Sequence, residues 1–180
     1  MSIEIEKKYR LTTEQREHVL KNLDEIGAKY HGEDFEENIL YRGGGLDGKN
    51  AVLRIRKIDG KTILTYKQRV QNDFDVKEQI EHETSIDDSE ELEKILEGLG
   101  FKKRLIYEKR RRTWGFRQTE IVVDELPFGL FMEIEGSITG IREIEMLLDI
   151  EDFETEHKTY PRLTAELGAA NGDLIEARFR

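Results

Sequence analysis

The sequence predicts an α+β fold in which antiparallel strands form a closed sheet and helices pack on its outer face. Seven segments alternate polar and apolar residues, as strands with one buried face do. Three further segments carry an apolar stripe at helical spacing. The polar faces of the strands repeat pairs of like charge, which a closed sheet with a polar interior and a helix-covered exterior would accommodate.

The composition indicates one folded domain, residues 1–180, without thiol chemistry. The chain has 180 residues, which is enough to bury a core, and no cysteine. Charged residues make up 38% of the chain, but a regular hydrophobic pattern distinguishes it from a disordered one. Disulfides, thiolate zinc sites and cysteine nucleophiles are therefore excluded.

Charge and hydropathy also limit the classes of binding partner that we expect. The net charge is −10, whereas a protein that grips a long nucleic acid usually shows a basic domain or stripe. We therefore expect no long nucleic acid as a partner. No apolar run reaches membrane length, and residues 1–8 do not resemble a signal peptide. We expect no membrane partner and a cytoplasmic location.

Helices are predicted where apolar stripes follow capping residues and stop at glycine. Three are clear, and a fourth, weaker one is indicated by Pro161 near its first position. The first helix follows Thr12–Thr13 and stops at Gly27, and the second opens at Asp87–Ser89 and stops at Gly98 or Gly100. The third runs from about Thr139 to Leu148, and the fourth starts at Thr159.

Strands are predicted in most of the remaining chain. Three of them end in a Glu-x-Glu pair that precedes a helix, which suggests a duplicated strand-and-helix plan. The pairs are Glu4/Glu6, Glu81/Glu83 and Glu133/Glu135. The predicted strands span residues 3–11, 51–57, 62–70, 76–84, 106–114, 119–125 and 130–135.

The charged faces of these strands have two interpretations. Taken one strand at a time, each is an ordinary polar face in contact with solvent. Taken together, the faces repeat Glu with Glu, Arg with Arg and Lys with Arg, and such like-charge neighbours repel unless an opposite charge lies between them. The second interpretation is that these faces surround a charged ligand.

A phosphate ligand with a metal ion would satisfy both sets of charges. A polyanion would lie among the basic residues Arg54, Arg56, Lys67, Arg69, Lys109 and Arg111. A divalent cation would lie among Glu4, Glu6, Glu133 and Glu135, because hard oxygen ligands suit Mg²⁺ or Mn²⁺.

The order of these motifs resembles the CYTH superfamily, the triphosphate tunnel metalloenzymes, over residues 3 to about 165. That superfamily includes class IV adenylate cyclases, thiamine triphosphatases, inorganic triphosphatases and fungal-type RNA triphosphatases. The matching elements are Glu4-Ile5-Glu6-Lys7-Lys8, Arg54-Ile55-Arg56, Thr65-Tyr66-Lys67, Glu81-His82-Glu83, Lys109-Arg110-Arg111, Asp124, Glu133-Ile134-Glu135 and Lys158-Thr159-Tyr160.

The resemblance implies a closed, eight-stranded antiparallel tunnel and a role for each matching residue. The residues that it implies for phosphate binding are Lys8, Arg54, Arg56, Lys67, Arg69, Lys109, Arg111 and Lys158. The implied Mg²⁺ or Mn²⁺ ligands are Glu4, Glu6, Asp124, Glu133 and Glu135, with Glu81 and Glu83 holding a metal-bound water or orienting basic side chains. The residues expected to act in catalysis are Glu4, Glu6, Lys8, Arg56, Lys67, Glu133 and Glu135.

The chain departs from the family pattern at two places. An arginine usually precedes the second acidic pair, but this chain has Gln79 there, with Lys77 nearby. The residue that makes this phosphate contact is therefore not assigned. Thr159 stands where serine is usual, which is a mild change.

Three functions are compatible with these residues. The first is a metal-dependent triphosphatase that acts on tripolyphosphate, thiamine triphosphate or another small triphosphate. The second is a class IV adenylate cyclase that converts ATP to cyclic AMP and pyrophosphate, although no adenine pocket is evident. The third is a polyphosphate- or nucleotide-binding protein without turnover. A homodimer is implied by the resemblance alone.

Overall fold

The computed structural model describes residues 5–70 and 78–180, except for the side chains at 69, 70, 78 and 79. Its elements in chain order are β1 (Glu6–Leu11), α1 (Thr13–Glu25), β2 (Lys29–Arg42), a 3₁₀ turn (Asp47–Lys49), β3 (Ala51–Ile58), β4 (Lys61–Val70), β5 (Glu78–Ile86), α2 (Ser89–Gly98), β6 (Lys102–Phe116), β7 (Thr119–Leu126), β8 (Gly129–Glu135), α3 (Ile138–Leu148), α4 (Tyr160–Leu167), β9 (Ala169–Asn171) and β10 (Leu174–Ala177). The α+β class is confirmed.

Each of the four α-helices in the described parts of the chain begins where the sequence places a capping residue. Thr12 and Gln15 form a reciprocal capping box at the start of α1. The Asp88 side chain accepts a bond from the Glu91 amide at the start of α2. Ser137 and Thr159 cap α3 and α4 in the same way. The four predicted helices are confirmed to within a residue or two at their starts.

The long strand β2 lies where the sequence pattern predicted none, as do the short strands β9 and β10. Strand β2 is 14 residues long and pairs with both β3 and β6. Near its end it has a short apolar run, Ile39–Tyr41, that is buried on both faces. A strand that is buried on both faces lacks the alternation by which strands are recognised, so β2 was missed.

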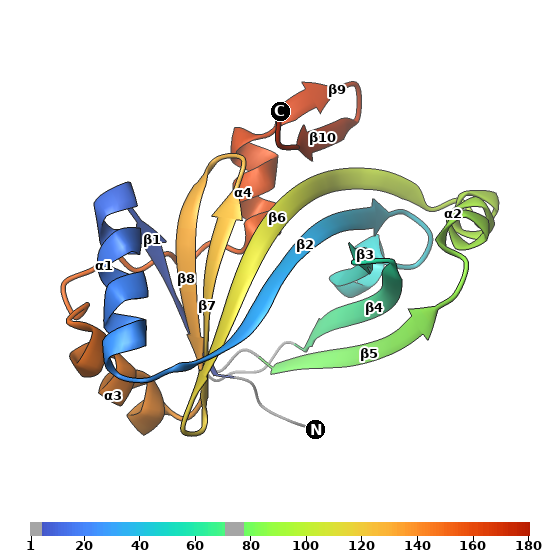
Figure 1. The fold of residues 1–180 in the computed structure, drawn as a ribbon. Coiled ribbons are helices and arrows are strands. Elements are labelled where there is room, and N and C mark those ends of the chain that lie inside the picture. Colours follow the sequence, from blue (N-terminus) through green and yellow to red (C-terminus); the bar gives the residue numbers. More distant parts are fainter. Residues whose placement is uncertain (1–4, 71–77) are drawn as a thin grey trace.

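The main sheet is antiparallel and strongly curved (Figure 1). Its strand order is β1-β8-β7-β6-β2-β3-β4-β5, and the short β10 adds to β6 in parallel. Between the described parts of β1 and β5, the two ends of this order, no pairing is found, so the predicted closed barrel is not confirmed.

The free edge of β1 is occupied by a later part of the chain. The Arg10 amide donates to the Glu154 carbonyl at 3.0 Å, and the Glu156 amide donates to the Lys8 carbonyl at 2.9 Å. Because these bonds use the edge groups of Lys8 and Arg10, β5 cannot pair there in this structure.

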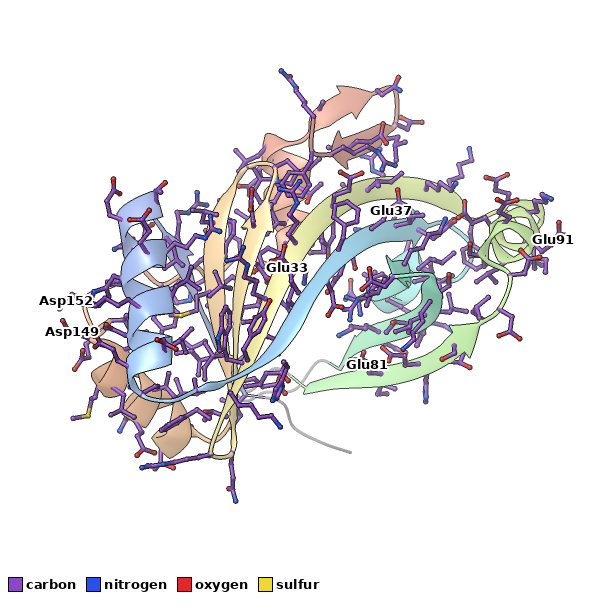
Figure 2. The ribbon with its side chains drawn as sticks, viewed as in Figure 1. Glu33, Glu37, Glu81, Glu91, Asp149 and Asp152 are labelled. Atoms are coloured by element: carbon purple, nitrogen blue, oxygen red, sulfur yellow. The ribbon has the colours of Figure 1, made fainter. Side chains whose placement is uncertain are left out.

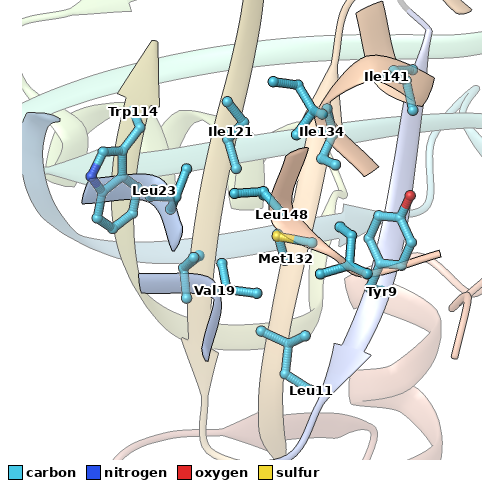
Figure 3. Close-up of a cluster of buried hydrophobic side chains, with 13 residues drawn as sticks. Tyr9, Leu11, Val19, Leu23, Trp114, Ile121, Met132, Ile134, Ile141 and Leu148 are labelled. Carbon is cyan, nitrogen blue, oxygen red and sulfur yellow. The ribbon is translucent and has the colours of Figure 1, made fainter. Parts of the chain in front are cut away.

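Helices α1, α2 and α3 cover the convex face of the sheet. Beneath α1 and α3, a cluster that includes Tyr9, Val19, Ile121, Met132 and Leu148 fills the space against β1, β8, β7 and β6 (Figure 3). A second cluster packs α2 against β2, β3 and β6. These residues are the apolar halves of the alternating strands, so their burial directs the charged halves to the concave side.

Helix α4 corrects the expectation that all helices lie outside. Its Tyr160 and Leu163 pack with Leu40, Tyr107 and Phe131. Those three residues share the strand faces of Asn38, Lys109 and Glu133, so α4 closes one end of the concave face. The physical reason is that this end of the face is apolar and needs a cover. Within the described chain, no helix combines the length and apolarity needed to cross a bilayer.

Candidate active site on the concave face

Strand register brings the predicted acidic and basic residues opposite one another. Lys8 on β1 lies across from Glu133 on β8, and Arg111 on β6 lies across from Asp124 on β7. Further round the sheet, Lys67 on β4 lies across from Glu81 on β5, which Figure 2 labels. The charges that alternation assigned to one face of each strand therefore meet on the concave face of one sheet.

Arg111 is the centre of the best-defined cluster. Its Nε and Nη2 donate to the two oxygens of Asp124 at 2.8 and 2.6 Å, and Nη2 also donates to Glu133 at 2.5 Å. The Lys8 ammonium lies 3.3 Å from the other Glu133 oxygen. Asp124 is fully buried, so these charges form one connected network that solvent screens weakly.

A second cluster lies on β2, β3 and β6. The buried Lys109 ammonium is 3.3 Å from Glu36 and 3.8 Å from Asp124. Arg56 Nε is 3.7 Å from the same Glu36 oxygen and donates to the Asn38 amide oxygen at 3.4 Å. Glu36 thus joins a lysine and an arginine that come from different strands.

The β3–β4 side of the face holds a less neutralised cation. Arg54 Nη2 donates to the Thr65 hydroxyl at 3.4 Å, and that hydroxyl donates to Glu83 at 3.2 Å. Among the described side chains Arg54 forms no ion pair, and its Nε is buried without a hydrogen-bond partner. Lys67, by contrast, pairs with Glu81 at 2.8 Å. An anion at Arg54 would supply the missing acceptor.

Burial and neighbouring charge set the protonation of these groups. Burial would raise the pKa of Asp124, but the Lys109 charge and the Arg111 bonds lower it below its ordinary value. Burial would likewise raise the pKa of Glu36, and the charges of Lys109 and Arg56 lower it. For Lys109 itself burial dominates and lowers the pKa. Both carboxyl groups are therefore ionised at neutral pH.

These lowered values predict acid sensitivity. The ordinary values are 4.5 for Glu36 and 3.8 for Asp124, and a group whose folded pKa is lower contributes stability above its ordinary value that is lost as pH falls through the folded pKa. We expect the free energy of unfolding, measured by urea titration, to fall from about pH 5 to about pH 3. Glu36→Gln should be less stable at pH 7 and less sensitive to acid. Glu37→Gln, on the opposite face, should retain the wild-type acid sensitivity, and equal profiles for all three proteins would contradict this assignment.

The acidic side of the face has the chemistry of a cation site. Burial raises the pKa of Glu6, and the charge of Glu133 raises it further. Glu6 lies opposite Glu135 in the β1–β8 ladder. A divalent cation would relieve this repulsion, so the donor set fits a hard metal ion. Among the described residues no group of three or more acidic or histidine side chains is already gathered into a ligand set. Glu4, another predicted ligand, lies outside the described residues.

Other predicted residues are placed differently or lie outside the description. The Lys158 side chain pairs with Glu166 at 2.6 Å near the surface, while its backbone carbonyl accepts a bond from Lys8 at 3.1 Å. Arg69 lies on β4 and Gln79 on β5, and for both residues the structure describes the backbone but not the side chain. Lys77 lies outside the described residues.

Three residues of the concave face were missed as site residues. Glu36 and Asn38 lie on β2, which was not predicted as a strand, so no face could be assigned to them. Tyr160, whose hydroxyl donates to Asp124 at 2.7 Å, was read only as part of a C-terminal motif. The spacing of Glu36 and Asn38, two apart before an apolar run, was the available signal.

Residues 2–163 match the family described as the CYTH domain. The chain belongs to the CYTH family. A relative from Methanocaldococcus jannaschii, named as a candidate adenylate cyclase, is 31% identical over 151 residues, which cover 82% of this chain and 84% of the relative. The suspected family is therefore confirmed.

Solved structures share the CYTH fold. The PH1012 protein of Pyrococcus horikoshii superposes with a TM-score of 0.74 at 25% identity, covering 89% of this chain and 98% of that one. A Hippeastrum protein superposes with a TM-score of 0.68 at 17% identity, covering 92% and 96%. The Hippeastrum protein is described as a candidate adenylyl cyclase with a dominant triphosphatase activity. Family membership supports an enzyme that acts on a small triphosphate and depends on metal.

Proposed function

We propose that this protein is a metal-dependent enzyme that binds a linear triphosphate on its concave face and hydrolyses one of its phosphoanhydride bonds. The observation that carries the proposal is the convergence of cations from four strands onto one face, between carboxylates. These cations are Lys8, Arg54, Arg56, Lys67, Lys109 and Arg111. A polar face intended for solvent has no need to bury lysine and aspartate together.

In this proposal the cations bind phosphate oxygens and stabilise the charge that develops as the bond breaks. Arg54 would take the first phosphate, because its guanidinium has an unused buried donor. Each of the other cations would either replace its contact with a carboxylate by a contact with a phosphate oxygen, or keep both contacts. The sheet would surround the ligand as a tunnel.

The acidic residues would hold the metal. Glu6, Glu133 and Glu135, with Glu4, would be the ligands of Mg²⁺ or Mn²⁺, and such an ion neutralises phosphate charge and activates the attacking oxygen. Glu81 and Glu83 are engaged with Lys67 and Thr65, which favours the second of their two predicted roles, the orientation of polar and basic side chains.

Hydrolysis requires one bond to form and one to break. A water oxygen attacks the terminal phosphorus, the bond from that phosphorus to the bridging oxygen breaks, and the bridging oxygen leaves with the remaining diphosphate. The water proton passes to solvent or to phosphate. The cations on the concave face stabilise both the attacked and the leaving phosphate.

A class IV adenylate cyclase is the second candidate, and the name of the Methanocaldococcus relative favours it. In that reaction a ribose hydroxyl replaces water, attacks the α-phosphorus of ATP and releases pyrophosphate. The same cations would hold the triphosphate, so the charged face is compatible with either reaction.

A substrate panel resolved by product tests these candidates together. Purified protein is incubated with Mg²⁺ or Mn²⁺ and with tripolyphosphate, thiamine triphosphate or ATP, and the products are separated. We expect orthophosphate and the corresponding diphosphate. Cyclic AMP with pyrophosphate would establish the cyclase instead. Tight binding by calorimetry without any product would leave the third function, a non-catalytic triphosphate-binding protein.

A further inference from the structure

Tyr160 contacts three charged residues of the candidate site, Asp124, Lys8 and Lys109. It is the first residue of α4, it is 6% exposed, and it lies at the end of the concave face that α4 closes. Its hydroxyl donates to the buried Asp124 at 2.7 Å. Its ring centroid lies 4.1 Å from the Lys8 ammonium and 5.5 Å from the Lys109 ammonium.

These contacts connect two strands that are not neighbours in the sheet. Lys8 is on β1 and Lys109 is on β6, and β8 and β7 lie between those strands. One aromatic ring therefore lies within cation–π distance of two ammonium groups from strands that do not pair with each other. The chain just before the ring adds a third contact, because the Lys158 carbonyl accepts the Lys8 ammonium at 3.1 Å.

The ordinary interpretation of Tyr160 is that of a core residue. It packs edge-on against Phe131 with ring centroids 5.4 Å apart, and it belongs to the same buried cluster as Leu163. A phenylalanine or leucine would fill that volume as well. A core role requires neither a hydroxyl directed at a buried carboxylate nor a ring within cation–π distance of two lysines.

The contacts of Asp124 support a role in positioning. Arg111 occupies both of its oxygens, and Tyr160 adds a bond to Oδ2. In this arrangement Asp124 orders the cations around it, and the Tyr160 hydroxyl helps to fix the orientation of its carboxylate.

We propose that Tyr160 is a positioning residue of the candidate site, whose ring holds Lys8 and Lys109 and whose hydroxyl holds Asp124. Through these contacts it aims the two ammonium groups at one phosphate of the bound triphosphate. This inference rests on the proposed function, and it adds a residue that touches neither the phosphate nor the metal but fixes the cations that do.

Binding of tripolyphosphate without metal tests this role. Calorimetry in the presence of a chelator compares the wild type with Tyr160→Leu, Tyr160→Phe and Leu163→Ala. Tyr160→Leu removes ring and hydroxyl, and we expect its affinity to fall by about tenfold. Tyr160→Phe keeps the ring, and we expect its affinity to stay within about threefold of wild type. Leu163→Ala is the control for damage to the α4 core, and it should lower the melting temperature while leaving affinity unchanged.

A second readout needs no ligand. Protons above an aromatic face move upfield in NMR spectra, so the side-chain ε-methylene resonances of Lys8 should be shifted upfield in the wild type and in Tyr160→Phe, and not in Tyr160→Leu. The proposal is overturned if Lys8 shows no such shift in the wild type. It is also overturned if Leu163→Ala weakens binding as much as Tyr160→Leu. If the Lys8 shift is present but the wild type does not bind tripolyphosphate, the proposed function fails instead.

Discussion

Arg111→Ala is expected to destabilise the fold and remove the activity together. The substitution leaves Asp124 and Glu133 without the guanidinium that now binds both of them, at 2.6 and 2.5 Å from Nη2. Removing one partner of a buried ion pair typically costs about 3–5 kcal/mol, because the remaining charge stays buried. Loss of a donor to the developing charge should also lower phosphate release by about a hundredfold to a thousandfold.

The neighbouring Arg110 provides a matched control. It is the adjacent residue on β6, points to the opposite face, and forms an exposed pair with Glu125 at 3.4 Å. Exposed pairs contribute about 0–1 kcal/mol, so Arg110→Ala should retain nearly full stability and rate. Urea unfolding and phosphate release would be measured for both variants. If the two variants were indistinguishable, Arg111 would not be the centre of a buried network.

Glu133→Gln is expected to have the second large effect, on metal binding. Glu133 forms ion pairs with Arg111 and Lys8, and its negative charge helps to raise the pKa of Glu6. The amide keeps the shape of the side chain but loses the charge that a hard cation requires. We expect the affinity for Mn²⁺, titrated without phosphate and followed by calorimetry, to fall by roughly a hundredfold.

Glu125→Gln is the control for this experiment. Glu125 lies on β7 beside Asp124 but points to the other face, where it pairs with Arg110. It should bind Mn²⁺ as the wild type does. Unchanged Mn²⁺ affinity in Glu133→Gln would show that the acidic residues of β1 and β8 are not the metal site, whatever the enzyme does with phosphate.

Much of the fold followed from local patterns. Caps at Thr12, Asp88, Ser137 and Thr159 start α1, α2, α3 and α4, because side-chain oxygens there satisfy amides that the helix cannot. Strand alternation correctly separated the residues under the helices from those on the concave face. Strand β2 and the inward position of α4 could not be predicted, because both depend on burial by distant parts of the chain.

Local sequence is enough to tell which side chains share a face, since a period of two residues places Arg54 with Arg56 and Lys109 with Arg111 whatever their neighbours are. The partners of these side chains, by contrast, follow from the three-dimensional fold. The pairs Arg111–Asp124 and Lys8–Glu133 depend on strand order and register, and the contact of Tyr160 with two lysines depends on where α4 packs. Those arrangements arise from long-range burial of apolar surface, which no local pattern contains.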